Sequence, residues 1–167
     1  RYTKEMSGDD IGLFFTYNTQ PGEQIQVQIG VSFVSTANAR ENLDREQQGF
    51  RFDQVAHDAR RQWNDILSSV EVEGGTDEQK TIFYTALYHM LIHPNILQDV
   101  NGQYPAMESQ QILTTPHNRY TVFSLWDTFR NVHPFFTLVY PQMQLDMTQT
   151  LIDMYNECGW LPRWELY

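Results

Sequence analysis

The hydrophobic pattern of this chain changes at Ser35, from a repeat typical of strands to one typical of helices. In residues 25–33, apolar side chains occupy every second position: Ile25, Val27, Ile29, Val31 and Phe33. A period of two places one face of a strand on a core and the other face in water. Residues 11–17 form a second strand candidate, and residues 18–22 contain the Asn, Pro and Gly of a turn. Because two strands alone are marginally stable, we expect this pair to need partners outside the chain.

After Ser35 the spacing predicts two helices in succession. Ser35 or Thr36 can cap a helix over residues 37–46, and a longer helix follows over residues 53–67. The second helix carries one apolar stripe at helical spacing, formed by Val55, Ala59, Trp63, Ile66 and Leu67. Its opposite face is charged.

A capping box marks a third helix, in which Thr76 and Gln79 are the paired residues. The apolar band of this helix is broad, which predicts burial on more than one side. Residues 95–119 are then expected to form a long loop, and loops of that length are usually functional. Two further helices are predicted over residues 124–137 and 142–157. The fold class is therefore mixed, with strands first and helices afterwards.

The charge of the 167-residue chain limits its possible partners. Its formal net charge is −10, and no cluster of Lys or Arg interrupts this acidity. Nucleic-acid binding depends on basic side chains that neutralise phosphates, so we expect no nucleic-acid partner. No apolar run approaches the roughly 20 residues of a membrane helix, so we expect no transmembrane segment. A neutral substrate fits this composition better.

The first candidate site group is Trp126 and Asp127, which follow Ser124 at the end of the long loop. One interpretation is a helix cap, in which Ser124 caps the helix and Asp127 is the acid three residues later. The other is a sugar site, because Trp offers a flat apolar face to sugar C–H groups. A carboxylate such as Asp127 accepts hydrogen bonds from neighbouring hydroxyls. The cap interpretation does not explain Trp126.

The second group is Trp164 and Glu165, in a loop that Gly159 and Pro162 predict. Either the aromatic residues belong to the core and Arg163 pairs with Glu165 at the surface, or the loop presents a carboxylate between aromatic rings to a cavity. Two carboxylates in an aromatic cleft could also be the acid and base of a glycosidase. The residues alone leave these alternatives open.

A metal site in this chain is not expected. His89 and His93 are four residues apart on the third predicted helix, which is a spacing that metal ligands use. The zinc-protease motif, however, needs Glu directly after the first His, and Met90 stands there. Both histidines are expected to pack and to form hydrogen bonds instead.

Taken together, these segments resemble glycoside hydrolase family 92, the calcium-dependent exo-acting α-mannosidases. The resembling segments occur in one order through most of the chain, at residues 31–35, 38–43, 63–64, 70–76, 83–89, 120–128 and 159–166. The resemblance implies a fragment of a larger enzyme with three parts. Residues 1–35 would be the last strands of an N-terminal β-sandwich, residues 36–72 a helical linker, and residues 73–167 the first helices of an incomplete (α/α)6 toroid. The chain is expected to pack against the remainder of that enzyme.

The resemblance also implies an activity, which is the hydrolysis of terminal α-mannosides with inversion, with α-1,2 links of N-glycans or mannan favoured. Trp126, Asp127, Trp164 and Glu165 would then bind mannose in a mannose-containing oligosaccharide. The general acid, the general base and the main calcium ligands are expected beyond Tyr167, so this chain alone should be inactive. The implied location is the bacterial periplasm, cell surface or exterior. The alternatives are another toroid glycosidase, such as a trehalase-like enzyme, or a non-catalytic helical interaction domain.

Overall fold

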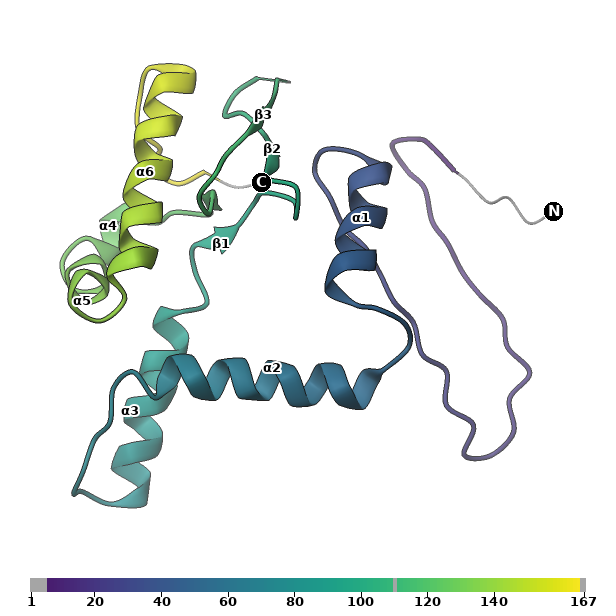
Figure 1. The fold of residues 1–167 in the computed structure, drawn as a ribbon, viewed down its shortest axis with the longest axis horizontal. Helices are drawn as coiled ribbons and strands as arrows, with labels where there is room; N and C mark the ends of the chain where they lie inside the picture. The colour runs from purple at the N-terminus through teal and green to yellow at the C-terminus, as the bar shows by residue number, and fades with distance from the viewer. Residues whose placement is uncertain (1–5, 110, 166–167) are drawn as a thin grey trace.

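The computed structural model describes residues 6–109 and 111–165 and contains both helices and short strands. The helices are α1 (Thr36–Glu46), α2 (Phe52–Leu67), α3 (Asp77–Met90), α4 (Leu125–Thr128), α5 (Val132–Val139) and α6 (Pro141–Cys158). The strands are β1 (Asn95–Ile96), β2 (Gln103–Pro105), β3 (Ile112–Thr114) and β4 (Tyr120–Thr121). β1 pairs with β4 and β2 with β3, both antiparallel. Figure 1 shows the strands between α6 and α1, with α2 running crosswise below them. The expected mixture of helices and strands is thus confirmed.

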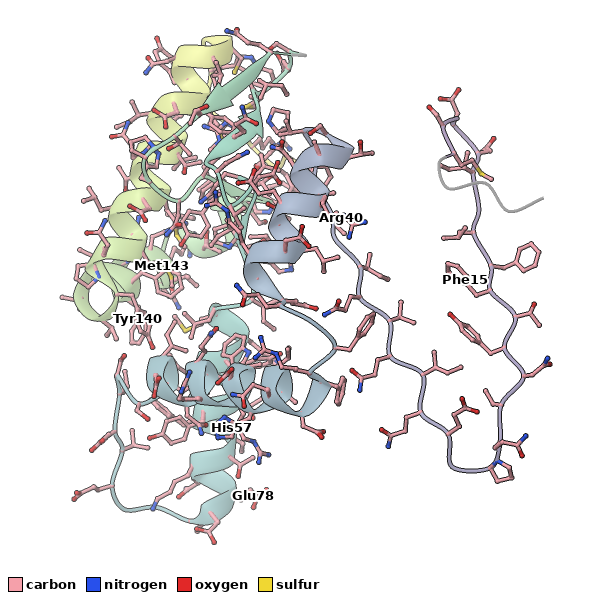
Figure 2. The ribbon with its side chains drawn as sticks, turned by 45° about the vertical axis from the view of Figure 1, so that its right-hand side comes forward. Phe15, Arg40, His57, Glu78, Tyr140 and Met143 are labelled. Carbon is pink, nitrogen blue, oxygen red and sulfur yellow. The ribbon has the colours of Figure 1, made fainter. Side chains whose placement is uncertain are left out.

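The N-terminal segment contains the clearest correction to the sequence-based expectations. The strands expected over residues 11–17 and 25–33 are not formed, although the turn between them is present at residues 21–22. Figure 1 shows the two limbs of this segment running apart from one another. In Figure 2, Phe15 lies on the outer limb, well away from the helices. A strand needs a second strand hydrogen-bonded to its backbone, and neither limb pairs with one among the described residues. The alternating apolar side chains are consequently exposed on both limbs.

α1 begins where the sequence predicts and is buried through polar side chains. Ser35 is its N-cap, and the Ser35 hydroxyl accepts a hydrogen bond from the backbone N–H of Asn38 at 3.0 Å. The buried residues of α1 are Asn38 and Asn42. Both side-chain amides donate to the carboxylate of Asp99 at 2.7 Å, and the Ser32 hydroxyl donates to it at the same distance. We call these four residues, Ser32, Asn38, Asn42 and Asp99, the Asp99 seam.

The extended segment approaches α1 closely just before this seam. A Cβ atom on Gly30 would lie 2.2 Å from the carbonyl oxygen of Ala39 in α1, so only glycine fits there. One residue later, the carbonyl of Val31 accepts a hydrogen bond from Asn42 at 2.8 Å. The end of the segment is therefore held against α1, and Gln28 donates to the carbonyls of Gln47 and Gly49, whereas the outer limb lies away from the helices in Figure 1.

α2 and α3 are less buried than expected. None of the residues of α2 is buried, and only its last turn, at Ile66 and Leu67, packs against the main core. α3 begins with the predicted capping box of Thr76 and Gln79, which is confirmed. Leu87 is its buried residue, and most of its apolar band remains exposed or half-buried. Burial of α3 on more than one side is therefore not found within this chain.

Two expectations for the second half of the chain are corrected. The loop expected over residues 95–119 contains strands β1, β2 and β3. The helix expected over residues 124–137 is divided into α4 and α5, with Pro134 in the first turn of α5. Proline lacks an N–H group and collides with the carbonyl four residues before it, so a helix can contain it only near its start. The predicted last helix is confirmed as α6, which ends at Gly159 in a left-handed conformation.

The main core lies between α3, α5, α6 and the segment that follows β4. Its buried members are Leu87, Met107, Tyr120, Phe123, Phe136, Tyr140, Met147 and Met154. Figure 2 shows Tyr140 and Met143 near one another at the junction of α5 and α6. Within the described part of the chain, no helix is long and apolar enough to span a membrane.

Candidate functional site

The candidate site begins with a sharp backbone turn after β4. Val122 follows this strand directly and has a φ of 64°, in the left-handed region. This conformation is rare for a β-branched residue. Keeping a residue there costs on the order of 1–3 kcal/mol, so surrounding contacts must hold it in place.

The hydroxyl of Ser124 organises the residues after this turn. It donates to Asp127 Oδ2 and accepts a hydrogen bond from Trp126 Nε1 at 2.7 Å. The Ser124 side chain forms no cap hydrogen bond with the backbone of α4. The helix-cap interpretation of Ser124 is therefore not supported, because its hydroxyl is used to orient Trp126 and Asp127 instead.

Glu165 reaches this segment from the other end of the chain. The backbone N–H of Phe123 lies 3.3 Å from its Oε1 and 3.2 Å from its Oε2. Burial raises the pKa of the Glu165 carboxyl above its usual value, while nearby backbone N–H groups and the Thr121 hydroxyl act in the opposite direction. Glu165 is half-buried.

The two predicted aromatic groups are brought together by the fold. The rings of Trp126 and Trp164 have their centroids 6.0 Å apart and are tilted by 50°. Arg163 lies over the Trp126 ring, with its guanidinium carbon 5.3 Å from the ring centroid. No ion pair joins Arg163 to Glu165 among the described residues, so the surface-pair interpretation is not supported. Trp126 and Trp164 are 52% and 56% exposed, which rules out the core interpretation of these two rings within this chain.

The site residues therefore form an open surface in this chain. Asp127 is exposed, Glu165 is half-buried, and the tryptophan rings lie between the two segments that carry them. Flat aromatic faces next to carboxylate acceptors can bind hydroxyl-rich molecules through C–H contacts and hydrogen bonds. Binding of mannose by these four residues stays a prediction.

Sequence reasoning missed a buried charged network behind the site. Arg119 is 1% exposed, and its Nη2 donates to Glu157 Oε2 at 2.9 Å. Tyr104 Oη donates to Glu157 Oε1 at 2.9 Å, and the backbone N–H of Met107 donates to Oε2 at 2.8 Å. Burial raises the pKa of Tyr104, and its hydrogen bond to Glu157 raises it further, so the phenol remains a donor. These residues are distant in the sequence and follow no periodic pattern that could have revealed them.

The calcium requirement that the family resemblance implies stays a prediction. In residues 6–109 and 111–165, no three His, Cys, Asp or Glu side chains are grouped so that they could hold a metal ion. Asp99 is the buried carboxylate of the Asp99 seam, and both of its oxygens accept hydrogen bonds from side chains. Protein donors therefore contact both carboxylate oxygens of Asp99.

A comparison with known protein families decides the classification. The model of the glycosyl hydrolase family 92 catalytic domain matches residues 38–167. The chain belongs to glycosyl hydrolase family 92. The recognised family is thus confirmed, and the matched range includes both Trp126–Asp127 and Trp164–Glu165.

Solved structures agree with this family membership. A family 92 α-mannosidase from Bacteroides thetaiotaomicron is 34% identical to this chain, with a TM-score of 0.75 over 81% of the chain. That enzyme has also been solved in complex with mannoimidazole. An uncharacterized secreted glycosidase from Arthroderma benhamiae is 24% identical over 154 residues, which is 90% of this chain. The family 92 chain described here spans 18% of the length of the first relative and 16% of the second.

Proposed function

We propose that this chain is part of an exo-α-mannosidase and that it contributes the surface that binds the terminal mannose. The observation that carries the proposal is the pairing of Trp126 with Trp164, which places Asp127 and Glu165 on adjoining segments. The neighbouring structure from Bacteroides thetaiotaomicron is that of an α-mannosidase, which supports the same substrate class. Because the chain belongs to family 92, the trehalase-like alternative is not proposed.

In this proposal each side chain has a separate task. The two tryptophan rings contact the apolar C–H face of the sugar, while the two carboxylates accept hydrogen bonds from its hydroxyls. Asp127 is already oriented by the Ser124 hydroxyl. Trp126 is oriented by the same hydroxyl. Trp126 and Asp127 are therefore held in place before any ligand binds, which lowers the entropic cost of binding.

The reaction itself is assigned to residues outside this chain. We propose hydrolysis with inversion, in which a general acid protonates the leaving oxygen and a general base activates water. The acid, the base and the calcium ligands would be supplied by the remainder of the enzyme, and α-1,2-linked mannosides are the favoured substrates. The proposed domain arrangement assigns residues 1–35 to a β-sandwich, 36–72 to a linker and 73–167 to the beginning of a toroid. A periplasmic or extracellular location is proposed, in keeping with a relative described as secreted.

The experiment is an assay of the full-length enzyme on α-1,2-, α-1,3- and α-1,6-linked mannobiosides, with and without a calcium chelator. We expect mannose release that the chelator abolishes, with α-1,2 links preferred. Proton NMR of the first product formed should show the β-anomer, as inversion requires. The 167-residue chain alone should release no mannose.

Retention of configuration would overturn the inverting mechanism, and full activity in chelator would overturn the calcium requirement. A full-length protein that binds mannosides without cleaving any of them would instead favour the non-catalytic alternative.

A further inference from the structure

We propose that Glu165 is a positioning residue whose carboxylate holds the backbone turn at Val122 and Phe123, and through it the orientation of Trp126 and Asp127. This role goes beyond the contact with sugar proposed above. It concerns the protein before any ligand binds, so it can be tested without substrate.

The first step of the argument is the contact between Glu165 and Phe123. The N–H of Phe123 is shared by both carboxylate oxygens, at 3.3 and 3.2 Å, across 42 positions in the sequence. A hydrogen bond to a charged acceptor is stronger than one between neutral groups. Glu165 therefore fixes the direction of the Phe123 N–H group, which is the peptide group directly after Val122.

The second step is the strain at Val122. Its φ of 64° is unfavourable for a β-branched side chain, and without a restraint the backbone would relax toward a negative φ. The Phe123 side chain is 1% exposed in the core and holds the turn on one side. The Glu165 carboxylate holds it on the other side, through the backbone. The turn is thus fixed from two independent directions.

The third step connects the turn to the site. Ser124 follows Phe123 directly, and its hydroxyl binds both Asp127 and the indole N–H of Trp126. The ring of Trp164, the residue before Glu165, contacts the Trp126 ring at a centroid distance of 6.0 Å. A change in the direction of the Phe123 peptide group would therefore move Ser124, and with it both site residues.

Glu165 can hold the turn and still contact a ligand. A carboxylate has two oxygens and about four lone-pair positions, so it can accept from the Phe123 N–H and other groups around the turn and still accept a hydrogen bond from a ligand hydroxyl. The two roles predict different results. Loss of the holding role changes the Trp126 signal without ligand, whereas loss of the sugar contact alone lowers only the activity.

The test uses the full-length enzyme and three variants. Glu165→Leu removes the acceptor, Glu165→Gln keeps one carbonyl acceptor, and Val122→Gly relieves the strain because glycine adopts a positive φ readily. Near-ultraviolet circular dichroism reports the environment of Trp126, and the difference from Trp126→Phe isolates its contribution. The value of kcat/KM is measured for each variant.

We expect Glu165→Leu to lose the Trp126 signal without ligand and to lower kcat/KM by about ten- to a hundredfold. Glu165→Gln should keep most of the signal. Adding Val122→Gly to Glu165→Leu should restore part of the signal, because the turn then needs less support.

An unchanged Trp126 signal in Glu165→Leu, together with reduced activity, would overturn the holding role and leave only the sugar contact. If Glu165→Leu does not fold, the double variant with Val122→Gly decides the question. Recovery of folding supports the proposal, and failure to fold contradicts it.

Discussion

Arg119 and Glu157 form a buried ion pair, with Nη2 2.9 Å from Oε2 and side chains that are 1% and 7% exposed. The same arginine donates to the carbonyl of Thr150 at 3.2 Å and lies over the Tyr104 ring. The pair thus joins β2, the residue before β4, and α6 into one unit. Tyr104 and the backbone N–H of Met107 donate to Glu157, so these hydrogen bonds add to the compensation of the buried charges.

Replacing Glu157 with Gln should destabilise the protein strongly, because the Arg119 charge would be left buried and unpaired. Removing one partner of a buried pair costs about 3–5 kcal/mol. The matched control is Glu41→Gln, which breaks the exposed pair of Glu41 and Arg45 and should cost about 1 kcal/mol or less. Urea unfolding of the full-length enzyme measures both. Equal losses of stability in the two variants would contradict the structural role of Glu157.

The stability that the Asp99 seam contributes should depend on the negative charge of Asp99. In Asp99→Asn, one carboxylate oxygen is replaced by an NH2 group, which cannot accept a hydrogen bond. At least one of the donors Ser32, Asn38 and Asn42 would then lose its acceptor. Each hydrogen bond to a charged group contributes about 1.5–3 kcal/mol. We expect a clearly lowered thermal midpoint, whereas Asp44→Asn on the exposed side of α1 should change it little. A midpoint as high as that of the wild type would show that the seam contributes nothing.

Asp127→Asn tests the proposed contact with sugar. The variant keeps the shape of the side chain but removes the charge, so kcat/KM of the full-length enzyme should fall by roughly ten- to a hundredfold. Its thermal midpoint should stay near that of the wild type, since Asp127 is exposed. Normal activity with a lowered midpoint would instead assign Asp127 a purely structural role in α4. Measuring both quantities on the same preparation separates the two outcomes.

Glu165 should give stability an unusual pH dependence. Burial raises the pKa of its carboxyl in the folded protein above the ordinary value of 4.5, so the folded state binds the proton more tightly than the unfolded state. The stabilisation is then fully present below about pH 4.5 and is lost as the pH rises through the folded pKa. Relative to Glu165→Gln, the wild type should therefore lose stability over this window. A difference between the two proteins that stays constant, or grows in favour of the wild type, would contradict the raised pKa.

Local signals in the sequence predicted helix starts reliably. The Ser35 cap and the capping box of Thr76 and Gln79 involve residues within one turn, so their hydrogen bonds can be read from spacing alone. The break between α4 and α5 could also have been predicted, because Pro134 cannot lie in the interior of a helix. The prediction of one helix over residues 124–137 is wrong for this reason.

Features that depend on distant partners could not be predicted in this way. The alternation in residues 25–33 correctly identifies an extended segment, but a strand also requires a neighbour, and none is present in the described chain. No sequence pattern joins Trp126 to Trp164, so the contact between their rings could not be derived from residue spacing. The hydrogen bond to Glu165 comes from the backbone N–H of Phe123. Because every residue except proline has this group, the residue type at position 123 does not indicate the bond.

The polar character of the Asp99 seam affects the heat-capacity change expected when α1 detaches. The heat capacity of unfolding arises mainly from exposing apolar surface, whereas exposing polar surface lowers it. α1 is buried through Asn38 and Asn42, so its separation from Asp99 would expose chiefly polar groups. Its detachment should therefore carry a heat-capacity change near zero or slightly negative. The free energy of that step would vary almost linearly with temperature, without the curvature expected where Phe136 and Met147 are exposed.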